Sequence, residues 1–174
     1  MKNHRQIALG ALGLAFLIIG SKLGVTLGPV PITFQTFATA IILLWLGPRL
    51  GSWVVAAYIG LGLIGLPVFA AGSGPGYVLK PTFGYLLGFL AGFLMANLTK
   101  KPRLRLFILL AMNYGIGVFY LGLMLKTNVM QTLAIGLWPF VWKDIILVGI
   151  ASIVYGRLAK GLDMLGVSYD RATS

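Results

Sequence analysis

The sequence has almost none of the residues from which enzymes build reactive sites. Cysteine and glutamate are absent, histidine occurs once, and the only acids are three aspartates. Without cysteine there is no disulfide, no thiolate nucleophile and no cysteine-ligated metal site. The single histidine, His4, stands in the polar N-terminus, and general acid–base chemistry near the apolar segments would rest on Asp144 alone. We therefore expect no enzyme activity, no cofactor and no metal.

Charged residues are also scarce, and their scarcity indicates the class of protein. Only 10% of the 174 residues are charged and 59% are hydrophobic, with a mean hydropathy of +0.95. Soluble domains carry about 25% charged residues, and a soluble fold of this size could not cover so much apolar surface. The basic residues behind the net charge of +11 are spread between apolar runs, which argues against nucleic-acid binding. The composition therefore predicts an integral membrane protein embedded in a lipid bilayer.

Several apolar stretches approach the length of about 20 residues that a helix needs to cross a bilayer. We expect a single all-α transmembrane domain over residues 1–174 with six transmembrane helices. The first stretch follows two basic residues and so resembles a signal peptide, but the later stretches favour a retained span. The expected spans lie at about 7–25, 30–46, 51–66, 82–99, 106–125 and 138–158.

The distribution of lysine and arginine predicts how these spans are oriented. With the N-terminus in the cytoplasm, ten basic residues fall on the cytoplasmic side and four on the outer side. The positive-inside rule then places both termini in the cytoplasm. A multi-pass protein of the plasma membrane is the expectation. The four outer lysines are Lys22, Lys80, Lys126 and Lys143.

Two polar side chains within apolar stretches point to a binding pocket. Asp144 is the only acid inside an expected span, where an ionisable group is costly and is a functional candidate by default; the alternative is an interfacial partner of Lys143. Gln35 stands at the outer end of the second span, and its amide needs partners away from lipid. Three threonines, which can also bond back to their own helix, flank it: Thr33, Thr36 and Thr39.

The longest outer connection, at about 66–89, is rich in glycine and has aromatic residues at its edges. Such a loop is either a lid over an apolar ligand or a plain connector. Lys80 within it either extends to the membrane interface or holds a carboxylate.

Small residues recur at four-residue spacing in two of the expected helices. Ala11 and Ala15 form one such pair, and Gly84, Gly88 and Gly92 form a longer series. This spacing lets helix backbones approach closely in lipid. The surfaces therefore pack either within the protein or against another membrane protein.

Five blocks of sequence occur along the chain in the order PVPITFQTFA, LGPRLG, GLPVFAAGSG, PTFGYLLGF and WPFVWKD. In this order they resemble the BioY family, the biotin-binding S components of energy-coupling factor (ECF) transporters. The resemblance implies capture of biotin from outside, with a transmembrane coupling subunit and two ATP-binding subunits as partners. Ala11 and Ala15 match the Ala-xxx-Ala pattern by which S components contact the coupling subunit. An S component for thiamine or riboflavin, or a stand-alone biotin carrier, is the alternative.

The chemistry of biotin then assigns roles to the candidate residues. Asp144 is expected to accept a hydrogen bond from an N–H of the ureido ring, while Gln35, Thr33 or Ser73 donates to the ureido carbonyl. Ser73 stands where the family commonly has an asparagine. Aromatic walls are expected for the rest of the ligand, from Phe69, Tyr77 and Tyr85.

The carboxylate of biotin needs a separate partner. Members of the family commonly carry Gly-Asp-x-x-Lys at the start of the last helix, whereas this chain has Leu147 at the lysine position. Lys80 or Lys143, both expected on the outer side, is therefore the predicted replacement.

Overall fold

The computed structural model describes residues 2–25 and 30–164, and this part of the chain is almost entirely helical. A two-stranded antiparallel sheet and a short 3₁₀ helix complete it. The elements in chain order are α1 (Lys2–Lys22), β1 (Gly24–Val25), β2 (Ile32–Thr33), α2 (Gln35–Trp45), α3 (Gly47–Leu63), η1 (Pro75–Leu79), α4 (Phe83–Ala96), α5 (Pro102–Leu125), α6 (Val129–Gly136) and α7 (Trp138–Met164).

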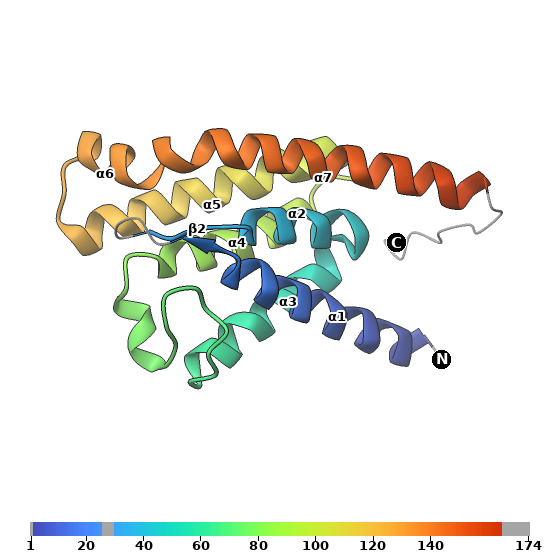
Figure 1. Cartoon of the computed structure of the whole chain (residues 1–174), viewed down its shortest axis with the longest axis horizontal. Coiled ribbons are helices and arrows are strands. Elements are labelled where there is room, and N and C mark those ends of the chain that lie inside the picture. Colours follow the sequence, from blue (N-terminus) through green and yellow to red (C-terminus); the bar gives the residue numbers. More distant parts are fainter. Residues whose placement is uncertain (1, 26–29, 165–174) are drawn as a thin grey trace.

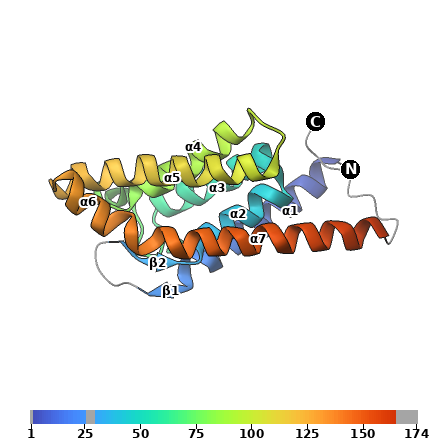
Figure 2. The ribbon, with the colours of Figure 1, turned by 90° about the horizontal axis from the view of Figure 1, so that it is seen from above.

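The helices pack side by side around a shared apolar core. The helix α4 lies against α5, α1 packs on α2 and α3, and α2 lies between α5 and α7 (Figure 2). The start of α1 and the end of α7 lie at one end of the molecule, and η1 and α6 lie at the other (Figure 1). Six helices contribute to the core, with Leu17, Leu43, Tyr58, Phe93, Leu109 and Ala151 as members.

Three helices in the described part of the chain are long and apolar enough to cross a membrane. They comprise His4–Lys22, Pro102–Leu125 and Trp138–Arg157, while α2 and α4 are shorter apolar helices. The predominantly helical, membrane-type fold is as expected from the hydropathy.

The second helix begins later than the sequence predicts. The expected span starts at residue 30, but α2 starts at Gln35, and Ile32–Thr33 form β2. Pro31 offers no backbone N–H and restricts the residue before it to extended conformations, so this stretch pairs with β1 instead of continuing the helix. Thr33, opposite Gly24, is therefore a strand residue, and the expectation that it belongs to the second helix, at about 30–46, is wrong.

The connection between the last two expected spans contains a helix that the sequence did not indicate. Lys126 ends α5 in a left-handed conformation, with φ of 52°. Asn128 then caps α6, its side-chain oxygen accepting a hydrogen bond of 2.9 Å from the backbone N–H of Gln131. At eight residues, α6 is too short for hydropathy alone to distinguish it from a loop.

The glycine series of α4 packs inside the protein. A methyl group added at Gly84 would lie 2.2 Å from Cβ of Tyr120, and one added at Gly88 would lie 2.6 Å from Cα of Asn113. A methyl group added at Gly92 would lie 3.0 Å from Cα of Leu109. The series therefore brings α4 against α5, as small residues do between membrane helices.

Candidate functional site

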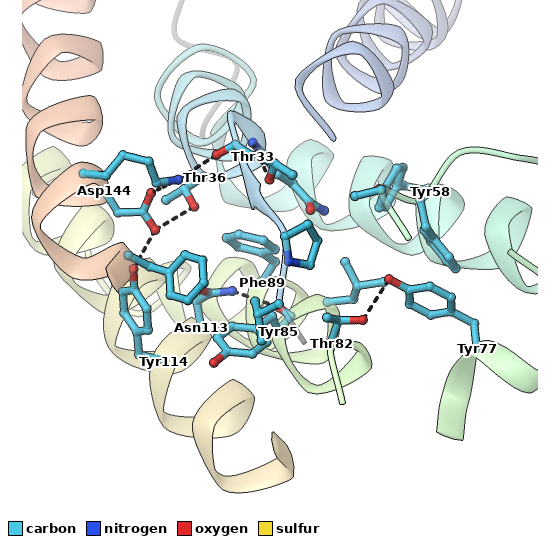
Figure 3. A pocket seen from close by; sticks show the side chains of 18 residues that line it. Thr33, Thr36, Tyr58, Tyr77, Thr82, Tyr85, Phe89, Asn113, Tyr114 and Asp144 are labelled. Atoms are coloured by element: carbon cyan, nitrogen blue, oxygen red, sulfur yellow. Dashed lines mark hydrogen bonds and ion pairs between the residues drawn. The ribbon is translucent and has the colours of Figure 1, made fainter. Parts of the chain in front are cut away.

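A cavity of about 60 Å³ lies among the helices near β2 and η1 (Figure 3). It is lined by residues from β2, α2, α3, η1, α4, α5 and α7, and by the connection that precedes η1. Asp144, Thr36 and Tyr114 lie at one end, and Tyr58, Tyr77 and Thr82 lie at the other (Figure 3). The lining consists of Val30, Pro31, Thr33, Gln35, Thr36, Tyr58, Phe69, Ala70, Tyr77, Thr82, Tyr85, Leu86, Phe89, Asn113, Tyr114, Phe140, Lys143 and Asp144.

Asp144 is the centre of the polar end. Its side chain is buried, with only 3% of the residue exposed, near the start of α7. The hydroxyl of Thr36 on α2 donates to Oδ2 over 3.0 Å, and that of Tyr114 on α5 donates to the same oxygen over 2.6 Å. Hydrogen bonds to an ionised acceptor are stronger than those between neutral groups. Two helices therefore hold one oxygen of this carboxylate.

The second oxygen of Asp144, Oδ1, contacts a lysine instead of hydroxyl groups. The ammonium of Lys143 lies 2.7 Å from Oδ1, and it also donates to the carbonyl of Thr33 over 2.6 Å. The contact with Oδ1 is an ion pair, and no other donor among residues 2–25 and 30–164 reaches this buried oxygen. A carboxylate oxygen can accept from more than one donor, so Oδ1 can still take a hydrogen bond beside its contact with Lys143. It is the atom of the cavity best suited to take an N–H from a ligand.

Asn113 and Tyr85 form the wall between α4 and α5. Asn113 is 2% exposed and donates through Nδ2 to the carbonyl of Tyr85 over 2.9 Å. The hydroxyl of Tyr85 donates to the carbonyl of Gly136 over 2.7 Å, and its ring meets that of Tyr114 edge to face at 6.5 Å. The Tyr85 hydroxyl is thus engaged by the protein, and its ring is what it offers to a ligand.

The aromatic end of the cavity is built from Tyr58, Phe69 and Tyr77. The ring of Phe69 lies 5.2 Å from that of Tyr58 and 4.4 Å from that of Tyr77. Thr82 donates to the hydroxyl oxygen of Tyr77 over 2.9 Å. Burial raises the pKa of Tyr77 more than this hydrogen bond lowers it, so the side chain is neutral at physiological pH.

The glycine-rich connection between α3 and η1 is tied to the end of α1. The hydroxyl of Ser21 donates to the carbonyl of Val68 over 2.7 Å, and the ammonium of Lys22 donates to that of Phe69 over 2.6 Å. Lys80 donates to the carbonyl of Ala71. These bonds hold Phe69 and Ala70 against the cavity, so this connection forms part of its wall.

Most of the residues that the sequence suggested for a ligand come together at this cavity. Two do not. Ser73 bonds to the neighbouring carbonyl of Gly72 over 2.7 Å, and Lys80 is exposed, with its ammonium 5.5 Å from the centre of the Tyr77 ring. The residues that do line the cavity are Thr33, Gln35, Phe69, Tyr77, Tyr85, Lys143 and Asp144.

Sequence reasoning missed several polar residues of the lining. Asn113 and Tyr114 lie within an apolar stretch, and the argument applied to Gln35, that an amide needs partners away from lipid, holds equally for Asn113. The further polar lining residues carried no comparable signal, because a tyrosine or threonine in a membrane helix is often explained by packing or local bonding. These are Tyr58 and Thr82, whereas Thr36 was expected beside Gln35 but was given no role of its own.

A second, apolar groove of about 420 Å³ lies on the outside of α1 and α3. Ala11 lines it, and both Ala11 and Ala15 are exposed in the described structure. Trp53 on α3 stands at the same groove with 72% of its surface exposed. The small residues of α1 therefore face outward, in contrast to the glycine series of α4.

Comparison with known proteins places these features in context. The model of the BioY family matches residues 1–164. The biotin transporter BioY of Thermotoga maritima is 35% identical over 164 residues, which cover 90% of this chain and 96% of that protein. A probable biotin transporter BioY of Pyrococcus horikoshii is 34% identical over 157 residues, covering 88% and 96%. The crystal structure of the S-component for biotin from an ECF-type ABC transporter superposes with a TM-score of 0.77 at 27% identity, covering 91% of this chain and 93% of that one.

Proposed function

The chain belongs to the BioY family, and we propose that it is the high-affinity biotin-binding S component of an ECF-type transporter. In this role it captures biotin from the outer side of the membrane, and partner subunits supply the energy for uptake from ATP. The observation that carries the proposal is the cavity around Asp144, where Thr36 and Tyr114 hold one oxygen of a buried carboxylate and Lys143 is the partner of the other among the described residues.

The ureido ring of biotin suits the polar end of this cavity. It presents N–H donors beside a carbonyl acceptor, and the ion pair of Asp144 and Lys143 presents an acceptor and a donor side by side. In our proposal Oδ1 of Asp144 accepts a ureido N–H and the ammonium of Lys143 donates to the ureido carbonyl. Thr33 and Gln35 line the same end and supply further polar contacts.

The apolar part of biotin suits the opposite end. The bicyclic ring would pack on Tyr85, and the valeryl chain would extend toward Phe69 and Tyr77. Burial of such a chain contributes roughly 0.8 kcal/mol per CH₂ group. The carboxylate would then lie near the glycine-rich connection, whose residues Phe69 and Ala70 line the cavity and whose Ala71 carbonyl accepts from Lys80.

Binding requires the lining to move. A cavity of about 60 Å³ is smaller than the roughly 300–1,000 Å³ of pockets that hold drug-sized ligands. The side chain of Lys143 reaches from Asp144 to the carbonyl of Thr33 and so lies between α7 and β2. We propose that the ureido carbonyl takes the place of the Thr33 carbonyl as the acceptor for this lysine.

The direct test of the function is a binding titration of the purified protein with biotin, thiamine and riboflavin. We expect saturable binding of biotin alone. Binding of thiamine or riboflavin instead would assign the chain to another vitamin, and uptake of biotin by cells that lack the coupling and ATP-binding subunits would make it a stand-alone carrier.

The roles of Lys143 and Lys80 can be distinguished with an analogue of biotin that lacks the charged carboxylate. We expect Lys143→Met to weaken biotin and biotin methyl ester alike, by about tenfold or more, because Lys143 contacts the ureido end. We expect Lys80→Met to weaken biotin by about two- to fivefold, as for an exposed ion pair, and to leave the ester unaffected. If the ester instead cancels the effect of Lys143→Met, the carboxylate lies at Lys143.

We also propose the full membrane arrangement of six spans in the plasma membrane, with both termini in the cytoplasm and one substrate-binding domain over residues 1–174. Lys22, Lys80 and Lys143 all bond to carbonyls around the cavity. The cavity, near β2 and η1, lies away from the start of α1 (Figure 1). This supports an outer location for the cavity.

The partner surface is proposed to be the exposed side of α1. Ala11 and Ala15 leave room there for the close approach of a helix of the coupling subunit, which works with two ATP-binding subunits.

Enlarging these alanines should therefore separate uptake from binding. We expect the double variant Ala11→Trp/Ala15→Trp to lower ATP-dependent biotin uptake by about tenfold or more, because the bulky side chains keep the helices apart. Biotin binding to the purified subunit should stay within about twofold of the unchanged protein. Ala111→Trp, at an exposed position of α5, is the matched control, and an equal loss of uptake in it would argue against docking at α1.

A further inference from the structure

Tyr114 stands out among the cavity residues because it contacts the carboxylate of Asp144 from a different helix. Its hydroxyl donates to Oδ2 over 2.6 Å, while Thr36 donates to the same atom over 3.0 Å. Both hydroxyls donate to one oxygen, so the other, Oδ1, has the ammonium of Lys143 at 2.7 Å as its partner and no further donor among the described residues. The pair therefore selects which oxygen of Asp144 remains to accept from a ligand.

The position of Tyr114 does not depend on a ligand. Its ring packs edge to face on Tyr85, at 6.5 Å and 89° between the rings. The preceding residue, Asn113, is bonded to the backbone of α4 through the carbonyl of Tyr85. The ring also packs on the cluster formed by Val30, Tyr85, Leu121 and Phe140. The Tyr114 hydroxyl is thus held by α4 and α5 while the carboxylate it contacts belongs to α7.

A carboxylate that lacked these two donors would be free to rotate about its χ2 angle, since this torsion has broad minima. Either oxygen could then turn toward Lys143, and the acceptor would no longer face the cavity in one orientation. Preorganised polar groups bind more tightly because the cost of ordering them has been met in the folded protein. Tyr114 and Thr36 provide that order here.

We propose that Tyr114, assisted by Thr36, is a positioning residue for ligand recognition: it fixes Asp144 so that Oδ1 faces the ureido N–H. This inference rests on the proposed function, because the ligand that profits from the fixed oxygen is biotin. The competing explanation is that the hydroxyl only ties α5 to α7, in which case its loss would affect stability and all ligands alike.

A double-mutant cycle on biotin affinity separates the two explanations. The variants are Tyr114→Phe, Asp144→Asn and the two combined. We expect Tyr114→Phe to weaken biotin by about tenfold, as for loss of a hydrogen bond to a charged group, and to change the affinity by less than about twofold once Asp144 is asparagine. Tyr120→Phe is the matched control, since its hydroxyl, also on α5, bonds to the carbonyl of Val78 and it does not line the cavity. Equal effects of Tyr114→Phe in both backgrounds would overturn the proposal.

A second measurement covers the case in which the Asp144→Asn protein binds too weakly for the cycle. Biotin analogues methylated at one or the other ureido nitrogen are titrated against the unchanged protein, and the weaker binder identifies the N–H that meets Asp144. Tyr114→Phe should leave the affinity of that analogue within about twofold while weakening biotin. A loss of equal size for both ligands would make the role purely structural. If the unchanged protein does not bind biotin, the proposed function itself fails, which is a distinct result.

Discussion

Asp144→Asn is expected to weaken biotin binding by about a hundredfold or more, which corresponds to about 2.7 kcal/mol. The change preserves the shape of the side chain and removes its charge. Thr36 and Tyr114 both donate to one oxygen, so an asparagine would present its oxygen to them and its NH₂ group to the cavity. A donor would then face the ureido N–H. Truncating one partner of a buried, hydrogen-bonded charge pair typically costs about 2–5 kcal/mol.

The measurement is a titration of purified protein, with Asp163→Asn as the control. That variant makes the same change of net charge at a second aspartate, 19 positions further along the sequence. A thermal melt of both variants separates a binding effect from a folding effect. An affinity within about threefold of the unchanged protein would show that Asp144 does not contact the ligand.

Gly88→Ala is expected to destabilise the protein by forcing α4 away from α5. The added methyl group would lie 2.6 Å from Cα and 2.9 Å from the carbonyl oxygen of Asn113. Both atoms belong to the backbone of α5, so they can yield only if the two helices separate. Overpacking of this kind costs about 1–3 kcal/mol. Because Asn113 and Tyr114 would move with α5, biotin affinity should also fall, by about threefold or more.

Gly115→Ala on α5 is the matched control, because no heavy atom of the described residues would lie within 4 Å of its new methyl group. Alanine in a helix is favoured over glycine by roughly 0.5–1 kcal/mol. The control should therefore melt at the same temperature as the unchanged protein or higher, and Gly88→Ala should melt several degrees lower. Equal melting temperatures for the two variants would mean that the α4–α5 contact is less close than described.

The helix boundaries illustrate where sequence reasoning succeeds. Hydropathy located the long helices α1, α5 and α7 because burial in lipid depends on many residues and is nearly additive along a segment. It misplaced the start of α2 and overlooked α6. The start of α2 depends on Pro31 and on the pairing of β1 with β2, and the start of α6 depends on the Asn128 cap. Each involves only a few residues, so hydropathy averaged over a window does not detect it.

The glycine and alanine series show a second limit. Both have the spacing that allows close helix contact, and the spacing cannot say what lies opposite. In the structure, Gly88 faces the backbone of α5, whereas Ala11 faces an open groove. The difference arises from the rotation of each helix about its axis, which is set by packing with the other helices.

The sequence by itself determined that this is a helical membrane protein of the BioY family and that Asp144 and Gln35 need polar surroundings. The five ordered sequence blocks indicate the family. Composition and charge suffice for the rest because the cost of a polar group in lipid does not depend on the fold. Only the tertiary structure decided that Tyr114 and Thr36 would meet Asp144 at one oxygen, that Lys143 would pair with the other and that Lys80 would stay outside the cavity lining. Such contacts join residues up to 108 positions apart in the chain. They depend on how the helices are rotated and tilted against one another.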